Sequence, residues 1–147
     1  MRRLDRITIV LMQFAHPHIR VRDLAASLDF FCGKLGLAEI GRQEIESPKY
    51  SLVYLAAPED VRPTNIAASP CLELACVHDD APVTDGTRFA HLAFFVDDLE
   101  RTCASLAARG VTVSVPPQPD GYAYIVSPEG MTIELLRRPV QARQPAA

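Results

Sequence analysis

The chain has 147 residues, which suits one compact unit that buries about two-thirds of its unfolded surface. Its net charge is −3, and Lys and Arg are spread singly along the chain, so no basic stripe is present and nucleic acid is not an expected partner. No segment approaches the roughly 18 apolar residues that span a bilayer, so a membrane is not an expected partner either.

The first 13 residues are predicted to form an N-terminal arm or an extra strand. Charged residues there precede an apolar run, Ile7–Phe14, which is too short for a signal peptide and is not followed by a small-residue cleavage site. The cysteines have apolar neighbours and no CxxC spacing, which favours reduced thiols in a cytoplasmic protein. They are Cys32, Cys71, Cys76 and Cys103.

The chain carries one pattern twice. The stretch "HPHIRVRDLAASLDFFCGKLG" from His16 can be aligned with "HLAFFVDDLERTCASLAARG" from His91. Each copy begins with His, has Val five residues later and then Asp-Leu, and closes on Gly. In each copy we expect a strand before the Asp and a helix capped by that Asp. The predicted buried stripes are Leu24, Leu28, Phe31 and Leu35 in the first helix, and Leu99, Cys103 and Leu106 in the second.

Short β-type runs follow each helix, so each half reads βαβββ. The runs cover residues 38–45, 50–57 and 70–77 in the first half, and 111–116, 122–127 and 131–138 in the second. The predicted class is α+β, with two paired βαβββ modules. The expected order is an arm (1–13), a first module (14–80), a linker (81–88), a second module (89–138) and a frayed tail (139–147).

Each half ends on a strand with a central carboxylate, Glu73 in "LEL" and Glu134 in "IEL". A carboxylate in the middle of such a strand is costly to bury unless it is paired or bound to a cation. If the first and last strands lie adjacent, His16, Glu73, His91 and Glu134 converge. Two imidazoles and two carboxylates suit a divalent transition metal such as Zn, Ni, Co or Mn.

The segments "HPHIRVRDLAASLDFFCGKLGL", "KYSLVYLA", "CLEL", "FAHLAFFVDDLE" and "AYIVSPEGMTIELL" resemble the vicinal oxygen chelate superfamily, most closely the bacterial lactoylglutathione lyases (glyoxalase I). The resemblance runs from His16 to Arg138. It implies a cupped mixed sheet around a metal, and a homodimer whose interface completes the site. The family's four ligands match His16, Glu73, His91 and Glu134.

By this resemblance, the chain isomerises the hemithioacetal of methylglyoxal and glutathione to a thioester, a detoxification reaction. A divalent cation would stabilise the enediolate as a Lewis acid. Glu134 is the implied base, with Glu73 as its near-symmetric counterpart, and general base catalysis commonly supplies about 10²–10⁴-fold.

Substrate-binding residues match the family less well. Arg20 matches an arginine that holds a glutathione carboxylate, which a guanidinium can bind through two hydrogen bonds. The alternative is that Arg20 is a solvated arginine at the end of a strand. Arg88 is a second candidate. Val77 stands where these lyases commonly carry Asn, and Asp120 lies near the place of a basic residue. The substrate could therefore be a different thiol adduct or another molecule with vicinal oxygens.

Other residues on the same strand faces have simpler expected roles. His18 shares a face with His16, and a simple polar contact is its favoured role over a pocket role. The aromatic residues Phe95, Tyr122 and Tyr124 are candidates to line an apolar pocket, although strand aromatics are more often core. Cys71 shares a face with Glu73, and a buried inert thiol is expected there.

Two other classes of function remain open from the sequence. The first is another reaction on the same scaffold, either epimerisation or ring cleavage by a dioxygenase, for which Fe(II) and O₂ consumption would be diagnostic. The second is a non-catalytic protein that sequesters a drug between two subunits. A metal-free preparation that still binds an aromatic ligand would support it.

Overall fold

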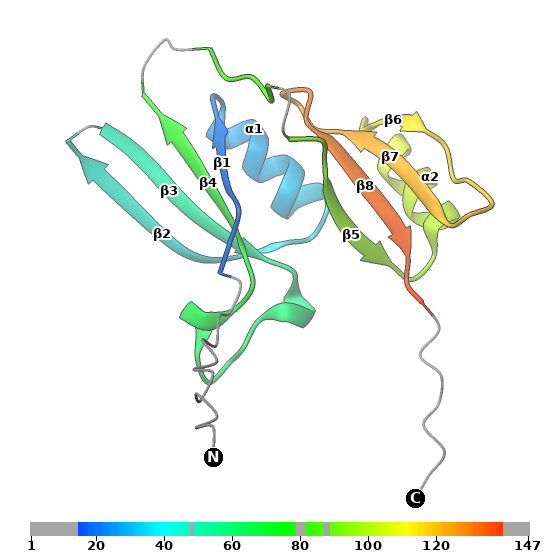
Figure 1. The fold of residues 1–147 in the computed structure, drawn as a ribbon, viewed down its shortest axis with the longest axis horizontal. Helices are drawn as coiled ribbons and strands as arrows, with labels where there is room; N and C mark the ends of the chain where they lie inside the picture. The colour runs from blue at the N-terminus through cyan, green and yellow to red at the C-terminus, as the bar shows by residue number, and fades with distance from the viewer. Residues whose placement is uncertain (1–14, 48, 79–81, 87–88, 140–147) are drawn as a thin grey trace, which may run out of the picture.

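The computed structural model describes residues 15–47, 49–78, 82–86 and 89–139, and these form two four-stranded sheets (Figure 1). The expected N-terminal arm lies outside the described residues, as does the expected tail apart from Pro139. Arg88 also lies outside them. The predicted α+β class is confirmed, because each half of the chain builds its own mixed sheet.

The first module contains the sheet with the order β1-β4-β3-β2. Its strands are β1 (His18–Val21), β2 (Ala38–Glu46), β3 (Lys49–Ala56) and β4 (Leu72–Val77). Strand β1 runs parallel to β4, and the other neighbours are antiparallel. Two short 3₁₀ turns, η2 (Pro58–Asp60) and η3 (Ile66–Ala68), lie in the connection from β3 to β4. The parallel pairing places the first strand beside the last strand of the same module.

The second module repeats this topology in the order β5-β8-β7-β6. Its strands are β5 (Leu92–Val96), β6 (Thr112–Val115), β7 (Tyr122–Val126) and β8 (Thr132–Arg137). Strand β5 is again parallel to β8, while β8 and β6 are antiparallel to β7. In Figure 1 the two sheets occupy opposite sides of the molecule, with α1 drawn between them and α2 beyond the second sheet.

An aspartate caps each main helix, as the repeat predicts. The helices are α1 (Leu24–Leu28) and α2 (Leu99–Ala108). Asp23 and Asp98 each accept a hydrogen bond of 2.9 Å from the backbone N–H three residues later. The glycines that close the two segments, Gly36 and Gly110, have φ of 81° and 80°, which only glycine adopts without strain. In the described part of the chain, no helix has the length and apolar character needed to cross a bilayer.

The first helix continues as a π-helical segment, η1 (Asp29–Lys34), which the sequence does not predict. Here Leu35 N donates to Phe30 O at 2.9 Å, a bond that spans one residue more than in an α-helix. The extra residue rotates the helix, so Phe30 and Phe31 are both buried. Leu24, Leu28 and Leu35 pack only partly against the core. The predicted stripe was therefore wrong in omitting Phe30.

One hydrophobic core cluster draws on both modules. Fully burying a Leu, Ile, Val or Phe side chain contributes about 1.5–3 kcal/mol, so this shared core favours folding as one unit. Its largest fully buried side chains are Phe30, Phe31, Val53, Leu55, Leu74, Leu99, Ile125, Ile133 and Leu135.

Polar contacts join the two modules at their edges. Arg138 lies 2.7 Å from Asp97 in its own module and 3.0 Å from Glu59 in the first module. Glu129, in the turn before β8, accepts hydrogen bonds of 2.7 and 2.8 Å from the backbone N–H groups of residues 22–23. These contacts act together with the core to hold the modules in one relative orientation.

The cysteines are all free, as the sequence predicts. Burial raises the pKa of the Cys32, Cys76 and Cys103 thiols, so they remain protonated at neutral pH.

Candidate metal-binding site

The first module brings His16 against Glu73. Glu73 stands in the middle of β4 between Leu72 and Leu74, and its register partner on β1 is His18. Because side chains alternate along a strand, His16 projects from the same face as His18 and Glu73. His16 Nε2 lies 2.5 Å from Glu73 Oε2, and the Glu73 side chain is only 8% exposed. We call His16 with Glu73 the first half-site.

The second module repeats this pair with His91 and Glu134. Glu134 stands in the middle of β8, and its register partner on β5 is Ala93, two residues after His91. His91 Nε2 lies 3.1 Å from Glu134 Oε2, the same two atoms as in the first half-site. The Glu134 side chain is 16% exposed. We call this pair the second half-site.

A tyrosine lies beside the carboxylate in both half-sites. Tyr54 on β3 is the register partner of Glu73, and Tyr124 on β7 is the register partner of Glu134. Tyr124 Oη donates to Glu134 Oε1 at 3.3 Å. Burial, followed by the Glu134 carboxylate, raises the pKa of Tyr124, and burial followed by Glu73 does the same for Tyr54. Both phenols therefore keep their proton at neutral pH and can donate it in a hydrogen bond.

The sequence pattern points to Tyr122 and Tyr124 but does not point to Tyr54. The available signal was a tyrosine at the matching place in the third strand of each module, visible once the strands are in register. The imidazole of His16 meets the Tyr54 ring edge-on with centroids 6.1 Å apart, and His91 lies 5.8 Å from Tyr124. The repeated unit is thus a histidine, a glutamate and a tyrosine.

His18 makes the polar contact that the sequence favours, and its partner is Glu73. His18 Nδ1 lies 3.2 Å from Glu73 Oε1, the carboxylate oxygen that His16 does not face. The second module has Ala93 at the matching place, so Glu134 receives no such contact. The two half-sites therefore differ in this imidazole and in the hydrogen bond from Tyr124 to Glu134.

The two half-sites do not meet within one chain. Over the described ranges, no group of three or more His, Cys, Asp and Glu side chains lies close enough to hold one metal ion. The convergence of four ligands is therefore not observed in a single chain. Each last strand pairs with the first strand of its own module, so each histidine meets the glutamate of its own half. Each module contributes one imidazole and one carboxylate, and the described residues of one chain supply two separate halves.

The donor atoms of the half-sites suit a divalent transition metal. Metal–nitrogen and metal–oxygen distances of about 2.0–2.2 Å place neighbouring ligand atoms of one ion about 3 Å apart. The 3.1 Å between His91 Nε2 and Glu134 Oε2 meets this condition, whereas the 2.5 Å between His16 Nε2 and Glu73 Oε2 is a direct hydrogen-bond distance. Imidazole and carboxylate are also the donor types that Zn, Ni, Co and Mn accept.

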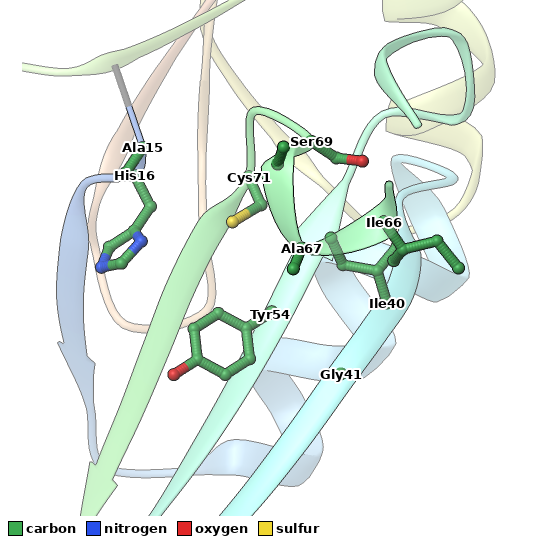
Figure 2. A pocket seen from close by; sticks show the side chains of 10 residues that line it. Ala15, His16, Ile40, Gly41, Tyr54, Ile66, Ala67, Ser69 and Cys71 are labelled. Carbon is green, nitrogen blue, oxygen red and sulfur yellow. The ribbon is translucent and has the colours of Figure 1, made fainter. Parts of the chain in front are cut away.

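A cavity of about 690 Å³ opens beside His16 (Figure 2). The Tyr54 ring lies between His16 on one side and Ile40 on the other, and Cys71 borders it. Apart from His16, none of the described lining residues carries a side chain that can be charged at neutral pH. The cavity therefore suits an apolar group, next to the first half-site.

The other residues that are predicted to line a pocket lie at different places in the structure. Cys71 lines this cavity, and burial followed by the Glu73 carboxylate raises the pKa of its thiol. Phe95 is 54% exposed and lines a different cavity, of about 420 Å³, between the modules. Tyr122 lies 5.6 Å from the Tyr124 ring, beside the second half-site.

Arg20 lies further along β1 on the face that carries His18. It lines a separate cavity of about 270 Å³ with Asp85 and Glu129. Val77 is the last residue of β4, and Asp120 lies in the exposed turn before β7. No residue of the apolar cavity beside His16 is an arginine among those described.

Comparison with known proteins places these features in context. Residues 13–135 match the Glyoxalase/Bleomycin resistance protein/Dioxygenase superfamily. The lactoylglutathione lyase of Haemophilus influenzae is 30% identical over 130 residues, which cover 85% of this chain and 92% of that protein. Glyoxalase I of Saccharomyces cerevisiae is 29% identical over 142 residues and 82% of this chain, but the chain spans only 43% of the yeast protein.

Among solved structures, the trypanothione-dependent glyoxalase I of Leishmania major is similar to this chain with a TM-score of 0.75. The two sequences are 27% identical, and the similarity covers 86% of this chain and 87% of the Leishmania chain. The paired-module fold is therefore shared over most of both molecules.

Proposed function

Because the chain belongs to the Glyoxalase/Bleomycin resistance protein/Dioxygenase superfamily, we propose that it is a metal-dependent lactoylglutathione lyase. It converts the hemithioacetal of methylglyoxal and glutathione into S-lactoylglutathione. The observation that carries this proposal is the pair of half-sites, which repeat the same atoms at the same strand positions. The names of the relatives support it.

The working site is proposed to form between two copies of the chain. His16 and Glu73 of one copy and His91 and Glu134 of the other would hold one divalent ion, Ni, Zn, Co or Mn. The separation of the two half-sites within one chain supports this homodimer. When bound, the ion supplies Lewis-acid stabilisation of negative charge on the two neighbouring oxygens of the substrate.

The proton transfer is assigned to Glu134. Its carboxylate takes the proton from the carbon that bears sulfur and returns it to the neighbouring carbon, while the hydroxyl proton passes to the second oxygen. The product has the same atoms and electrons as the substrate, so no oxidant is needed. The Glu134 side chain is twice as exposed as that of Glu73, 16% against 8%, which leaves it more room to swing toward a substrate. Glu73 is the near-symmetric alternative.

Substrate binding is proposed to use two surfaces. The apolar cavity beside His16 accepts the part of the substrate that carries no charge. Arg20, exposed on the same strand face, is the proposed partner of a carboxylate of the thiol. Arg88 remains the second proposed anchor.

The apolar cavity also favours a second candidate, a protein that binds an apolar small molecule without transforming it. A cavity of about 690 Å³ without Lys or Arg in its described lining is roomy enough for a drug-sized ligand. In that case the half-sites would serve no catalytic purpose.

One experiment separates these candidates. The purified protein is analysed for metal, stripped with a chelator, reloaded separately with Ni, Co, Zn, Mn and Fe(II), and assayed with methylglyoxal and glutathione. We expect one ion per chain and isomerase activity that disappears with the chelator and returns with metal. Bound metal without isomerase activity would reject the lyase, and O₂ consumption with Fe(II) would favour a dioxygenase. Binding of an aromatic ligand by an inactive, metal-free protein would favour the binding function.

A further inference from the structure

The two carboxylates of the half-sites are held unequally. Both oxygens of Glu73 face imidazoles, with His16 Nε2 2.5 Å from Oε2 and His18 Nδ1 3.2 Å from Oε1. Glu134 faces one imidazole, His91 at 3.1 Å, and one phenol, Tyr124 at 3.3 Å. Among the described residues, His18 is a nitrogen donor without a counterpart in the other half-site, where Ala93 stands at the matching place.

The surroundings of Glu73 add to this restraint. The residue is 6% exposed and lies between Leu72 and Leu74, which are also buried. Its backbone N–H donates to Pro17 O at 3.0 Å, which fixes β4 against the segment that carries both histidines. A turn of the Glu73 side chain away from this segment would break both imidazole contacts at once.

We propose that His18 is a positioning residue that holds Glu73 in place, so that Glu134 alone is free to move as the base. This inference rests on the proposed function. Because a carboxylate only accepts hydrogen bonds, the His18 imidazole donates through Nδ1 and stays bound to Oε1. Oε2 remains directed at His16 and available as a ligand atom. His18 thereby restrains Glu73 through a contact that Glu134 does not receive from Ala93 at the matching place.

The first arm of the test measures metal affinity and does not depend on turnover. Co(II) binding to the full chain is compared among the wild type, His18→Leu and His18→Asn, because Asn keeps an N–H donor close to the position of Nδ1. Loss of a hydrogen bond to a ligating carboxylate typically weakens metal binding by about 10–100-fold. We expect that loss in His18→Leu and recovery in His18→Asn. An unchanged dissociation constant in His18→Leu overturns the inference.

A matched control is available on the same sheet. His78 Nε2 lies 3.3 Å from Ser51 Oγ, so it is also a surface imidazole in one polar contact, but it does not touch either carboxylate. His78→Leu is expected to leave Co(II) affinity unchanged. An equal loss of Co(II) affinity in His78→Leu and His18→Leu would mean that the affinity depends on the imidazoles of this sheet in general. That result would overturn the specific role of His18.

The second arm asks whether freeing Glu73 lets it act as the base. Glu134→Gln is compared with the double variant His18→Leu/Glu134→Gln, both saturated with metal. We expect the turnover of the double variant to be at least 10-fold higher than that of Glu134→Gln. General base catalysis raises the rate by about 10²–10⁴-fold, and a freed Glu73 can take over part of the role of Glu134 as the base. A double variant no more active than Glu134→Gln overturns the inference. A wild type that binds Co(II) but lacks isomerase activity instead rejects the proposed function, and the metal-affinity arm still decides whether His18 positions Glu73.

Discussion

Tyr124 Oη donates a hydrogen bond of 3.3 Å to Glu134 Oε1, on the opposite side of the carboxylate from His91. The bond follows from the antiparallel register of β7 and β8, in which these two residues face each other. It directs Oε1 of the proposed base toward β7. Hydrogen bonds of this kind to a ligating carboxylate are part of how proteins tune metal sites.

Removing this hydrogen bond is therefore expected to impair the site. Tyr124→Phe should lower kcat or metal affinity by about 10–100-fold with little change in thermal stability. The matched control is Tyr122→Phe, because Tyr122 packs 5.6 Å from the Tyr124 ring and its hydroxyl is not bonded to Glu134. Steady-state kinetics with methylglyoxal and glutathione provide the measurement. Equal activities of the two variants would show that the Tyr124 hydroxyl does not contribute to the site.

Loss of the proposed base is expected to abolish most of the turnover while the fold is kept. Glu134→Gln should lower kcat by about 10²–10⁴-fold, the range that general base catalysis supplies. Glu100→Gln is the control, since Glu100 is exposed and forms a surface ion pair with Arg137. Turnover is measured at saturating metal, and circular dichroism verifies the fold. Near-normal turnover of Glu134→Gln would disprove the assignment of the base.

Arg20 is expected to act on substrate binding and leave the chemical step unaffected. Arg20→Met should raise KM for the glutathione adduct by about 10–100-fold with kcat little changed, because a hydrogen bond to a charged group is worth about 1.5–3 kcal/mol. Arg101→Met, in the exposed first turn of α2, serves as the control. A KM equal to that of the wild type would mean that the thiol carboxylate binds elsewhere.

The caps of the helices are expected to contribute to stability in a measurable way. Asp98→Ala removes the side-chain acceptor at the start of α2 and should lower the free energy of unfolding by about 1 kcal/mol. Asp98→Asn keeps an acceptor oxygen and should lower it by less. Urea unfolding of the three proteins measures the difference, and an Asp98→Ala curve that overlays the wild type would contradict the capping role.

The sequence predicts the elements of each half-site because they depend on local patterns. His16 and His91 are found by their equal spacing to Val and Asp-Leu, and the two glutamates by their central place in an apolar strand. Period-two alternation then assigns each side chain to a face of its strand.

Features that depend on contacts between distant strands could not be predicted in this way. The partners of Tyr54 and His18 are set by cross-strand register, which the order of residues along one strand does not contain. The π-helical turn around Phe30 accompanies the burial of both Phe30 and Phe31, and nothing in the apolar spacing signals an extra residue. The distance between the half-sites depends on how the modules are oriented, through contacts such as those of Glu129 and Arg138.

The proposal that two copies complete each site is tested most directly by mixing inactive variants. In a His16→Ala chain the first half-site is damaged, and in a His91→Ala chain the second. If each site combines half-sites from two copies, one of the two sites in a mixed dimer contains all four ligands. Unfolding and refolding an equal mixture should then restore roughly a quarter of the wild-type activity, because half of the randomly formed dimers are mixed. Each variant refolded alone should stay inactive. A mixture as inactive as its components would contradict a site shared between two copies.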